Sequence, residues 1–308
     1  MATQRTDVHH LADAAVVVGV DGSVAADTAL DWAADIAVCR DRALRIVHGY
    51  DTVGLRRVRD RHGDRVAPML DAAHSHAAAL VERAAQRVRA AAPGVRVSSE
   101  ATESGAAALL IRESETAYLV VLGAEGTSEF RSHLGSVLLT VAAHGHGAVV
   151  VVRTDPASGN AVHRQGPVVV GIDGSPVSEA ALAAAFEEAS ERGAELVAVH
   201  AWSDLDLGWF EGESELLVPV RDAGETQRAV LAERLAGWQE MFPDVRVSRR
   251  MYVSDPVRAL QQWSGSARLL VVGSRGRGGY LGTLLGSTSN SLVQHAECPV
   301  MVVHPPRS

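Results

Sequence analysis

The feature that most constrains the fold of this chain is an internal repeat. The segment Val16-Val17-Val18-Gly19-Val20-Asp21-Gly22-Ser23 returns as Val168-Val169-Val170-Gly171-Ile172-Asp173-Gly174-Ser175. Leu119-Val120-Val121-Leu122-Gly123 returns in the same way as Leu269-Leu270-Val271-Val272-Gly273. A period of about 150 residues is far longer than that of a solenoid, so it predicts a duplicated domain. We place the two domains of this 308-residue chain at residues 1–155 and 156–308.

Within each copy, short β-branched runs alternate with long stretches of helical composition. This alternation predicts an α/β fold, in which helices flank an open parallel sheet. We expect five strands per copy, centred on Val17, Ile46, Val97, Val120 and Val150, and on Val169, Val197, Val247, Val271 and Val302. The expected helices include residues 25–40, 69–91, 178–192, 226–241 and 288–296. Residues 51–67 and 203–224 are predicted as loops and residues 155–166 as the linker between copies.

Composition excludes several classes of protein. The chain contains no lysine, so the Gly-Lys-Ser/Thr loop of P-loop NTPases and Schiff-base chemistry are both excluded. A formal charge of −8 argues against a general nucleic-acid-binding protein. Only two cysteines occur, which rules out a disulfide framework or a cysteine metal cluster. The sequence shows neither a signal peptide nor an apolar run long enough for a membrane span, so we expect a cytoplasmic protein without a membrane partner.

Two loops of unusual composition fall where a ligand would bind, beyond the carboxyl ends of the strands. One is the Asp-Gly-Ser after the first strand. The other is the glycine-rich segment 273–287, which leads into a helix. Glycine lets backbone N–H groups face a ligand, the helix start favours an anion, and Ser287, Arg275 and Arg277 add donors. The segment therefore predicts a phosphate cradle, although such loops also occur as plain tight turns, and Leu281 breaks the dinucleotide-binding fingerprint.

These residues resemble the motif of the universal stress proteins, and of their tandem-domain members in particular. Gly273-x2-Gly276-x9-Gly286-Ser287 matches the family pattern in full, and the resemblance covers nearly the whole chain. It implies a five-stranded sheet in the order 3-2-1-4-5 and a bound ATP, with or without Mg²⁺. The implied nucleotide-binding residues of the second copy are Asp173, Gly174, Ala201, Gly273, Gly276, Gly286, Ser287 and Thr288.

The first copy departs from this pattern. Its corresponding residues are Asp21, Gly22, Gly123, Gly126, Gly135 and Ser136. The spacing between Gly126 and Gly135 is one residue shorter, and Glu125 stands where the second copy has Arg275. Since a carboxylate repels a polyphosphate, we expect the second copy to bind ATP more tightly, unless Arg131 compensates.

The last strand of each copy is almost wholly apolar, at residues 148–152 and 299–303. In the implied strand order this strand lies at an edge, and an exposed apolar edge would aggregate. We therefore expect the two last strands to pair, which makes the tandem chain an internal pseudo-dimer. The resemblance also implies that such proteins associate further, for example as homodimers.

Three functions remain open. The first is a nucleotide-binding stress-response regulator with an unidentified protein partner, which we favour because no catalytic group recurs at the phosphate end of both copies. The second is a slow ATPase or self-phosphorylating enzyme, in which Asp173 holds a metal and Ser287 lies near the γ-phosphate. The third is a structural pseudo-dimer with vestigial pockets. We assign no catalytic residue and no metal site, since paired histidines such as His74 and His76 fall on different helix faces. His48 and His200 recur in register, where we expect a structural role, either orienting the adenine side of the pocket or bonding the backbone.

Overall fold

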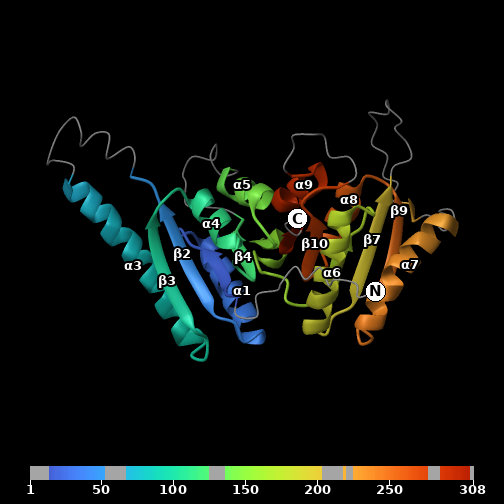
Figure 1. Cartoon of the computed structure of the whole chain (residues 1–308), viewed down its shortest axis with the longest axis horizontal. Coiled ribbons are helices and arrows are strands. Elements are labelled where there is room, and N and C mark those ends of the chain that lie inside the picture. Colours follow the sequence, from blue (N-terminus) through green and yellow to red (C-terminus); the bar gives the residue numbers. More distant parts are fainter. Residues whose placement is uncertain are drawn as a thin grey trace, which may run out of the picture. The chain divides into compact units, whose positions relative to one another are not determined.

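The computed structural model of the chain describes residues 14–52, 67–124, 136–202, 218–219, 225–276 and 285–305. These residues form two compact units, and the chain passes from one to the other between Val152 and Arg153 (Figure 1). None of the helices in these ranges is long and apolar enough to cross a membrane.

The first unit contains a parallel sheet with the strand order β3-β2-β1-β4-β5, as predicted. Four helices of the described residues run between the strands. The strands are β1 (Val16–Gly19), β2 (Leu44–Tyr50), β3 (Val97–Glu103), β4 (Leu119–Gly123) and β5 (Ala148–Val152), and the helices are α1 (Val24–Cys39), α3 (Ala67–Ala91), α4 (Ala106–Ser114) and α5 (Ser136–His144).

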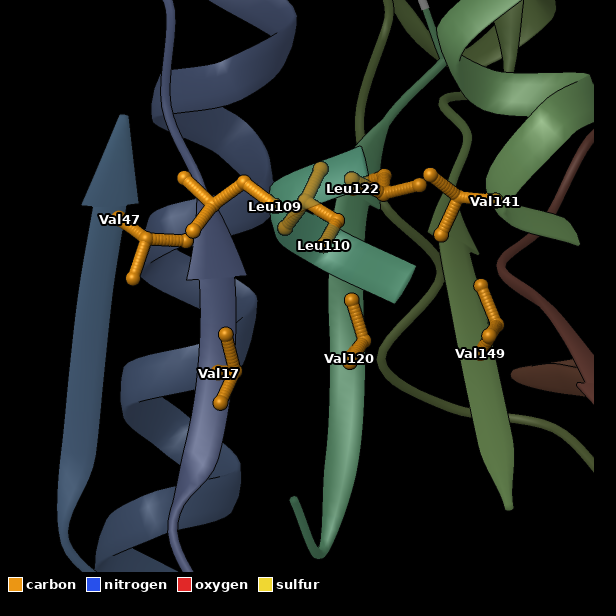
Figure 2. Packing of buried hydrophobic residues seen from close by; sticks show 8 residues of the cluster. All are labelled: Val17, Val47, Leu109, Leu110, Val120, Leu122, Val141 and Val149. Atoms are coloured by element: carbon orange, nitrogen blue, oxygen red, sulfur yellow. The ribbon is translucent and has the colours of Figure 1, made fainter. Parts of the chain in front are cut away.

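Its central strands are buried on both faces, which explains their unbroken valine runs. Helices α1 and α3 contact each other and the sheet, and so do α4 and α5. Figure 2 shows the core beneath the second pair, where strand valines such as Val17 and Val120 gather with Leu109 and Leu110 of α4 and Val141 of α5. Burial of this kind stabilises each side chain by about 1.5–3 kcal/mol.

The second unit repeats this plan. Its parallel strands have the order β9-β7-β6-β10-β11, which is again the predicted one. The strands are β6 (Val168–Gly171), β7 (Leu196–Trp202), β9 (Val247–Val253), β10 (Leu269–Gly273) and β11 (Val300–Val303), and the helices are α6 (Pro176–Glu191), α7 (Glu225–Met241), α8 (Pro256–Ser264) and α9 (Ser287–His295).

Two details differ from the sequence prediction. Residues 203–224 were expected to be a loop, but Val218–Pro219 form a short strand, β8, antiparallel to β9. The outer backbone groups of β9 can pair with any returning segment, and two residues give too little pattern to detect. The third strand of each copy also begins at Val97 or Val247 rather than being centred there. In β3, half-buried and exposed residues alternate, so the strand continues beyond its apolar residues.

The segment between the repeats folds back onto the second unit. Asp155 is buried, and its carboxylate accepts hydrogen bonds from the Ala157 N–H and the Ser158 hydroxyl. The His163 ring bridges this carboxylate and the backbone, with Nε2 3.1 Å from Asp155 Oδ2 and Nδ1 3.0 Å from the Ala267 carbonyl oxygen. This linker is therefore fixed by specific polar contacts despite its polar, glycine-bearing composition.

Candidate functional site

The Asp-Gly-Ser segments form equivalent turns at the carboxyl ends of β1 and β6. In each turn the serine N–H donates to the aspartate Oδ1, at 2.9 Å from Ser23 to Asp21 and 2.8 Å from Ser175 to Asp173. The central glycine has a φ of about +80° in both copies, a left-handed conformation that favours glycine. Each turn therefore holds one carboxylate at the carboxyl end of the central strand of its sheet, where a ligand is expected.

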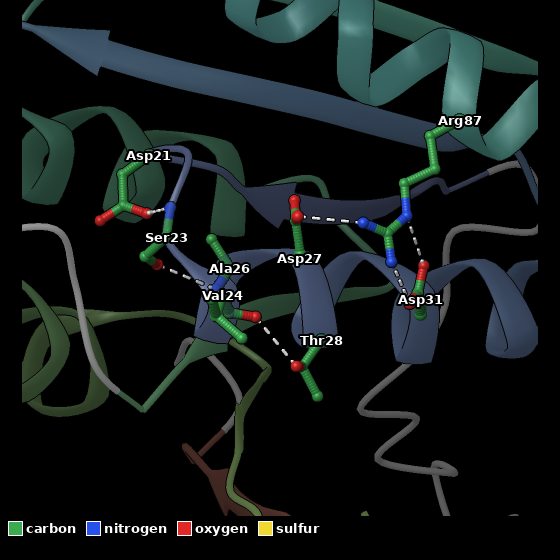
Figure 3. Close-up of polar contacts among 8 residues, drawn as sticks. All are labelled: Asp21, Ser23, Val24, Ala26, Asp27, Thr28, Asp31 and Arg87. Carbon is green, nitrogen blue, oxygen red and sulfur yellow. Dashed lines mark hydrogen bonds and ion pairs between the residues drawn. The ribbon is translucent and has the colours of Figure 1, made fainter.

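The serines of these turns cap the helices that follow. The Ser23 hydroxyl accepts from the Ala26 N–H at 3.0 Å (Figure 3), and the Ser175 hydroxyl accepts from the Ser178 N–H at 3.2 Å. Figure 3 also shows Arg87 of α3 bound to Asp27 and Asp31, which ties α3 to α1. One N–H group in the first turn of α1 and one in that of α6 is therefore bound by the capping serine.

The two recurring histidines have the expected backbone partners. His48 Nδ1 lies 2.7 Å from the Val20 carbonyl oxygen, and His200 Nδ1 lies 2.7 Å from that of Ile172. Each ring thus links the end of the second strand to the residue before the turn aspartate. Ala201 follows His200 on β7 and is half-buried.

The backbone brings the two ends of the glycine-rich segment together. At the end of β10, the Ser274 N–H donates to the Val303 carbonyl at 2.7 Å, and the Ser274 carbonyl accepts from the Gly286 N–H at 2.8 Å. A Cβ on Gly286 would lie 3.7 Å from the Gly276 nitrogen. Gly276 and Gly286 are therefore neighbours, as the phosphate-cradle hypothesis requires.

Helix α9 begins at this point without a side-chain cap. Its N-cap is Gly286, in an extended conformation, and this residue has no side chain that could accept from the first turn. Ser287 is exposed and Thr288 is half-buried, so the start of the helix is accessible. Free N–H groups and the positive end of the helix dipole make such a start favourable for an anion.

The turn aspartate and the second motif glycine also meet. A Cβ on Gly276 would lie only 2.5 Å from Asp173 Oδ2, closer than real Cβ contacts allow. The absence of a side chain at Gly276 therefore lets the carboxylate lie against the loop. Asp173, Gly276, Gly286 and the first residues of α9 form one group, which we call the α9 site.

Gly273 and Gly123 have an additional, structural reason to be glycine. A Cβ on Gly123 would lie 2.5 Å from the backbone carbon and oxygen of Ala25, at the start of α1. A Cβ on Gly273 would lie 2.9 Å from Val177 Cγ1, at the start of α6. The first glycine of each motif thus permits close helix–strand packing, whether or not a ligand binds.

The sequence analysis did not identify two serines of this region. The buried Ser289 donates its hydroxyl to the Gly273 carbonyl at 2.6 Å and so ties the first turn of α9 to β10. Ser274 is 1% exposed, and its hydroxyl has no hydrogen-bond partner among the residues that the structure describes. The hydrogen bond of Ser289 and the burial of Ser274 both depend on residues that are distant in sequence, so no local sequence pattern indicates them.

Part of the prediction lies outside the described residues. This holds for Gly126, Gly135, Glu125, Arg131 and Arg277. Ser136 begins α5, but the surroundings of its side chain are not described. The expected difference in affinity between the copies therefore stays a prediction, as does the pairing of the last strands.

Charge at the site is sparse within the described ranges. Arg275 is exposed, and Asp173 is half-buried. In the same part of the chain, no three His, Cys, Asp or Glu side chains gather closely enough to hold a metal ion. Cys298 is fully buried, and burial raises the pKa of its thiol to about 12.

Comparison with known proteins identifies the family of the chain. The model of the universal stress protein family matches residues 14–153 and again residues 166–304. The chain belongs to the universal stress protein family. It is a tandem member, since both repeats match.

Sequence relatives align over nearly the whole of both chains. A universal stress protein of Mycolicibacterium smegmatis is 40% identical over 296 residues, which cover 94% of this chain and 97% of the relative. One from Mycobacterium tuberculosis is 40% identical over 291 residues, with 93% and 96% covered. The solved structure of a universal stress protein from Archaeoglobus fulgidus agrees in fold, with a TM-score of 0.69, 20% identity and 94% and 98% coverage.

Proposed function

We propose that this universal stress protein binds ATP at the α9 site and acts as a cytoplasmic, nucleotide-dependent regulator of the stress response. The observation that carries the proposal is the uncapped start of α9 at Gly286, next to Gly276 and Asp173. The triphosphate would accept hydrogen bonds from the N–H groups of Ser287 and Thr288, while the helix dipole favours its charge.

The other residues of the site suit the remaining parts of a nucleotide. A carboxylate repels phosphate but accepts hydrogen bonds from hydroxyl groups, so Asp173 is assigned to the ribose. Ala201, beyond the His200 contact at the end of β7, is assigned to the base. Asp173 alone supplies a carboxylate among the site residues described, so Mg²⁺ would be held mainly by phosphate oxygens and water.

Binding is favoured over catalysis at this site. Ser287 is the exposed hydroxyl at the helix start, but no hydrogen bond of the described residues joins it to a carboxylate or a histidine. A nucleophile needs such a base for activation. ATP hydrolysis or self-phosphorylation would be seen as ADP or a phosphorylated chain that accumulates with time.

The proposal is tested by giving α9 a side-chain cap of its own. In Gly286→Asp the new Cβ meets no atom closer than 3.5 Å, so the fold tolerates it. The carboxylate would accept from the first turn, stabilise the helix by a few tenths of a kcal/mol to about 1 kcal/mol, and repel the triphosphate. Calorimetry should therefore show ATP binding by the unaltered protein and its loss in the variant.

The chain offers a matched control in Gly105→Asp. Gly105 is the N-cap of α4 in the first unit, it also lacks a side-chain cap, and a Cβ there meets nothing within 4 Å. This variant should gain similar stability and the same charge but keep its affinity for ATP. Equal affinities of Gly286→Asp and the unaltered protein would refute the assignment of phosphate to α9.

A further inference from the structure

The residue that directly follows the last strand of the first copy holds the far end of α9. Arg153 Nε donates to the Ala296 carbonyl at 2.6 Å, and its Nη1 donates to the Val293 carbonyl at 3.2 Å. Both acceptors belong to the C-terminal end of the helix, where the last carbonyl groups lack partners within it. A charged donor at this end also agrees with the helix dipole.

The helix depends on such contacts because it is short. It contains nine residues, and an isolated helix of this length is unstable in water. Its side is held by the buried Leu292 and Val293, and its first turn by the bond from Ser289 to Gly273. Arg153 supplies two charge-assisted hydrogen bonds at the opposite end.

A helix this short moves as a rigid body, so a shift at Ala296 also turns the N–H groups of Ser287 and Thr288. We propose that Arg153 is a positioning residue for phosphate binding, which acts by fixing the orientation of α9. The inference rests on the proposed function, because it concerns affinity for the triphosphate. It adds a residue that lies more than 100 positions from the glycine motif in sequence and contacts the end of α9 opposite the proposed phosphate contacts.

The test compares Arg153→Ala with Arg268→Ala in the full chain. Arg268 is a matched control because it also donates to two backbone carbonyls, those of Arg192 and Arg164. Unlike Arg153, it does not contact α9 in these bonds, since it directly precedes the first residue of β10, whereas Gly273 is the last residue of that strand. Calorimetry with ATP and with adenosine separates the phosphate contribution from that of the base and ribose.

We expect Arg153→Ala to raise the Kd for ATP on the order of tenfold and to change the Kd for adenosine by less than about twofold, as loss of orienting charged hydrogen bonds predicts. Arg153→Lys should restore part of the ATP affinity, and Arg268→Ala should leave it unchanged. Hydrogen exchange of the α9 amides should rise in Arg153→Ala and not in the control.

Three results would overturn the inference. They are an unchanged Kd for ATP in Arg153→Ala, an equal loss in Arg268→Ala, and unchanged exchange in α9. If the unaltered protein binds no ATP, the proposed function itself fails. Loss confined to Arg153→Ala, with binding intact in the unaltered chain, supports both.

Discussion

Replacement of Gly276 by alanine tests the contact between the loop and the turn aspartate. The new Cβ would lie 2.5 Å from Asp173 Oδ2, so the carboxylate must move by about 0.9 Å or more to reach an ordinary separation. Asp173 Oδ1 accepts the Ser175 N–H at 2.8 Å, and this bond is strained or lost. The cost is about 0.5–1.5 kcal/mol.

The net change in stability should nevertheless be small. Alanine lowers the conformational entropy of the unfolded chain, which stabilises the folded protein by about 0.4–1 kcal/mol. This gain applies because the φ of Gly276 lies outside the left-handed range and so suits alanine. The free energy of unfolding should therefore fall by less than about 1 kcal/mol. Because Asp173 is displaced, affinity for adenosine should fall by about 1 kcal/mol, or roughly fivefold.

The assay combines urea denaturation with calorimetry on four proteins, namely the unaltered chain, Gly276→Ala, Asp173→Ala and the double variant. The two changes should be strongly coupled, since alanine at 276 has no carboxylate to displace once Asp173 is gone. Gly265→Ala is the control, because its Cβ would meet the exposed Glu297 carboxylate at 3.0 Å. Additive effects on adenosine affinity would refute the reasoning.

Two further predictions concern buried polar groups. Ser274→Ala should leave the stability unchanged or raise it by up to about 1 kcal/mol in urea denaturation, because its hydroxyl has no partner in the described part of the chain. Ser264→Ala should instead cost about 1–3 kcal/mol, because it breaks the hydrogen bonds to the Gln261 carbonyl and from the Glu297 N–H. Equal costs would contradict this. The Ser158 hydroxyl, followed by His163, lowers the pKa of Asp155 from 3.8 to about 2, so its contribution to stability is present above about pH 4 and is lost as the pH falls toward 2. Unfolding measured across this range should show a fall that Asp155→Asn lacks; an identical fall in that variant would speak against it.

The fold could be predicted because its signals are local and occur twice. The valine runs are buried on both faces, and the turn serines cap α1 and α6. The five expected helices begin and end within two residues of α1, α3, α6, α7 and α9. Strand order required the family resemblance, since pairing between distant strands leaves no local pattern. The short β8 was missed for the same reason.

The candidate site could be predicted only in outline. Gly276 and Asp173 were identified as parts of separate motifs, but their contact joins two loops that lie about 100 residues apart in the sequence. Ser289 and Arg153 act on backbone carbonyls, which every residue carries, so no sequence pattern marks their partners. Gly273 was assigned to the ligand, whereas the structure also gives it a packing role.

The contacts made by residues 153–163 determine where an isolated second repeat has to begin. The family match resumes at residue 166, which invites a truncation there. Such a fragment would lose the arginine that anchors α9 and the Asp155–His163 bridge to Ala267. Expression of an isolated C-terminal half should therefore begin before Arg153, so that weak ligand binding by a shorter piece is not mistaken for a property of the intact protein.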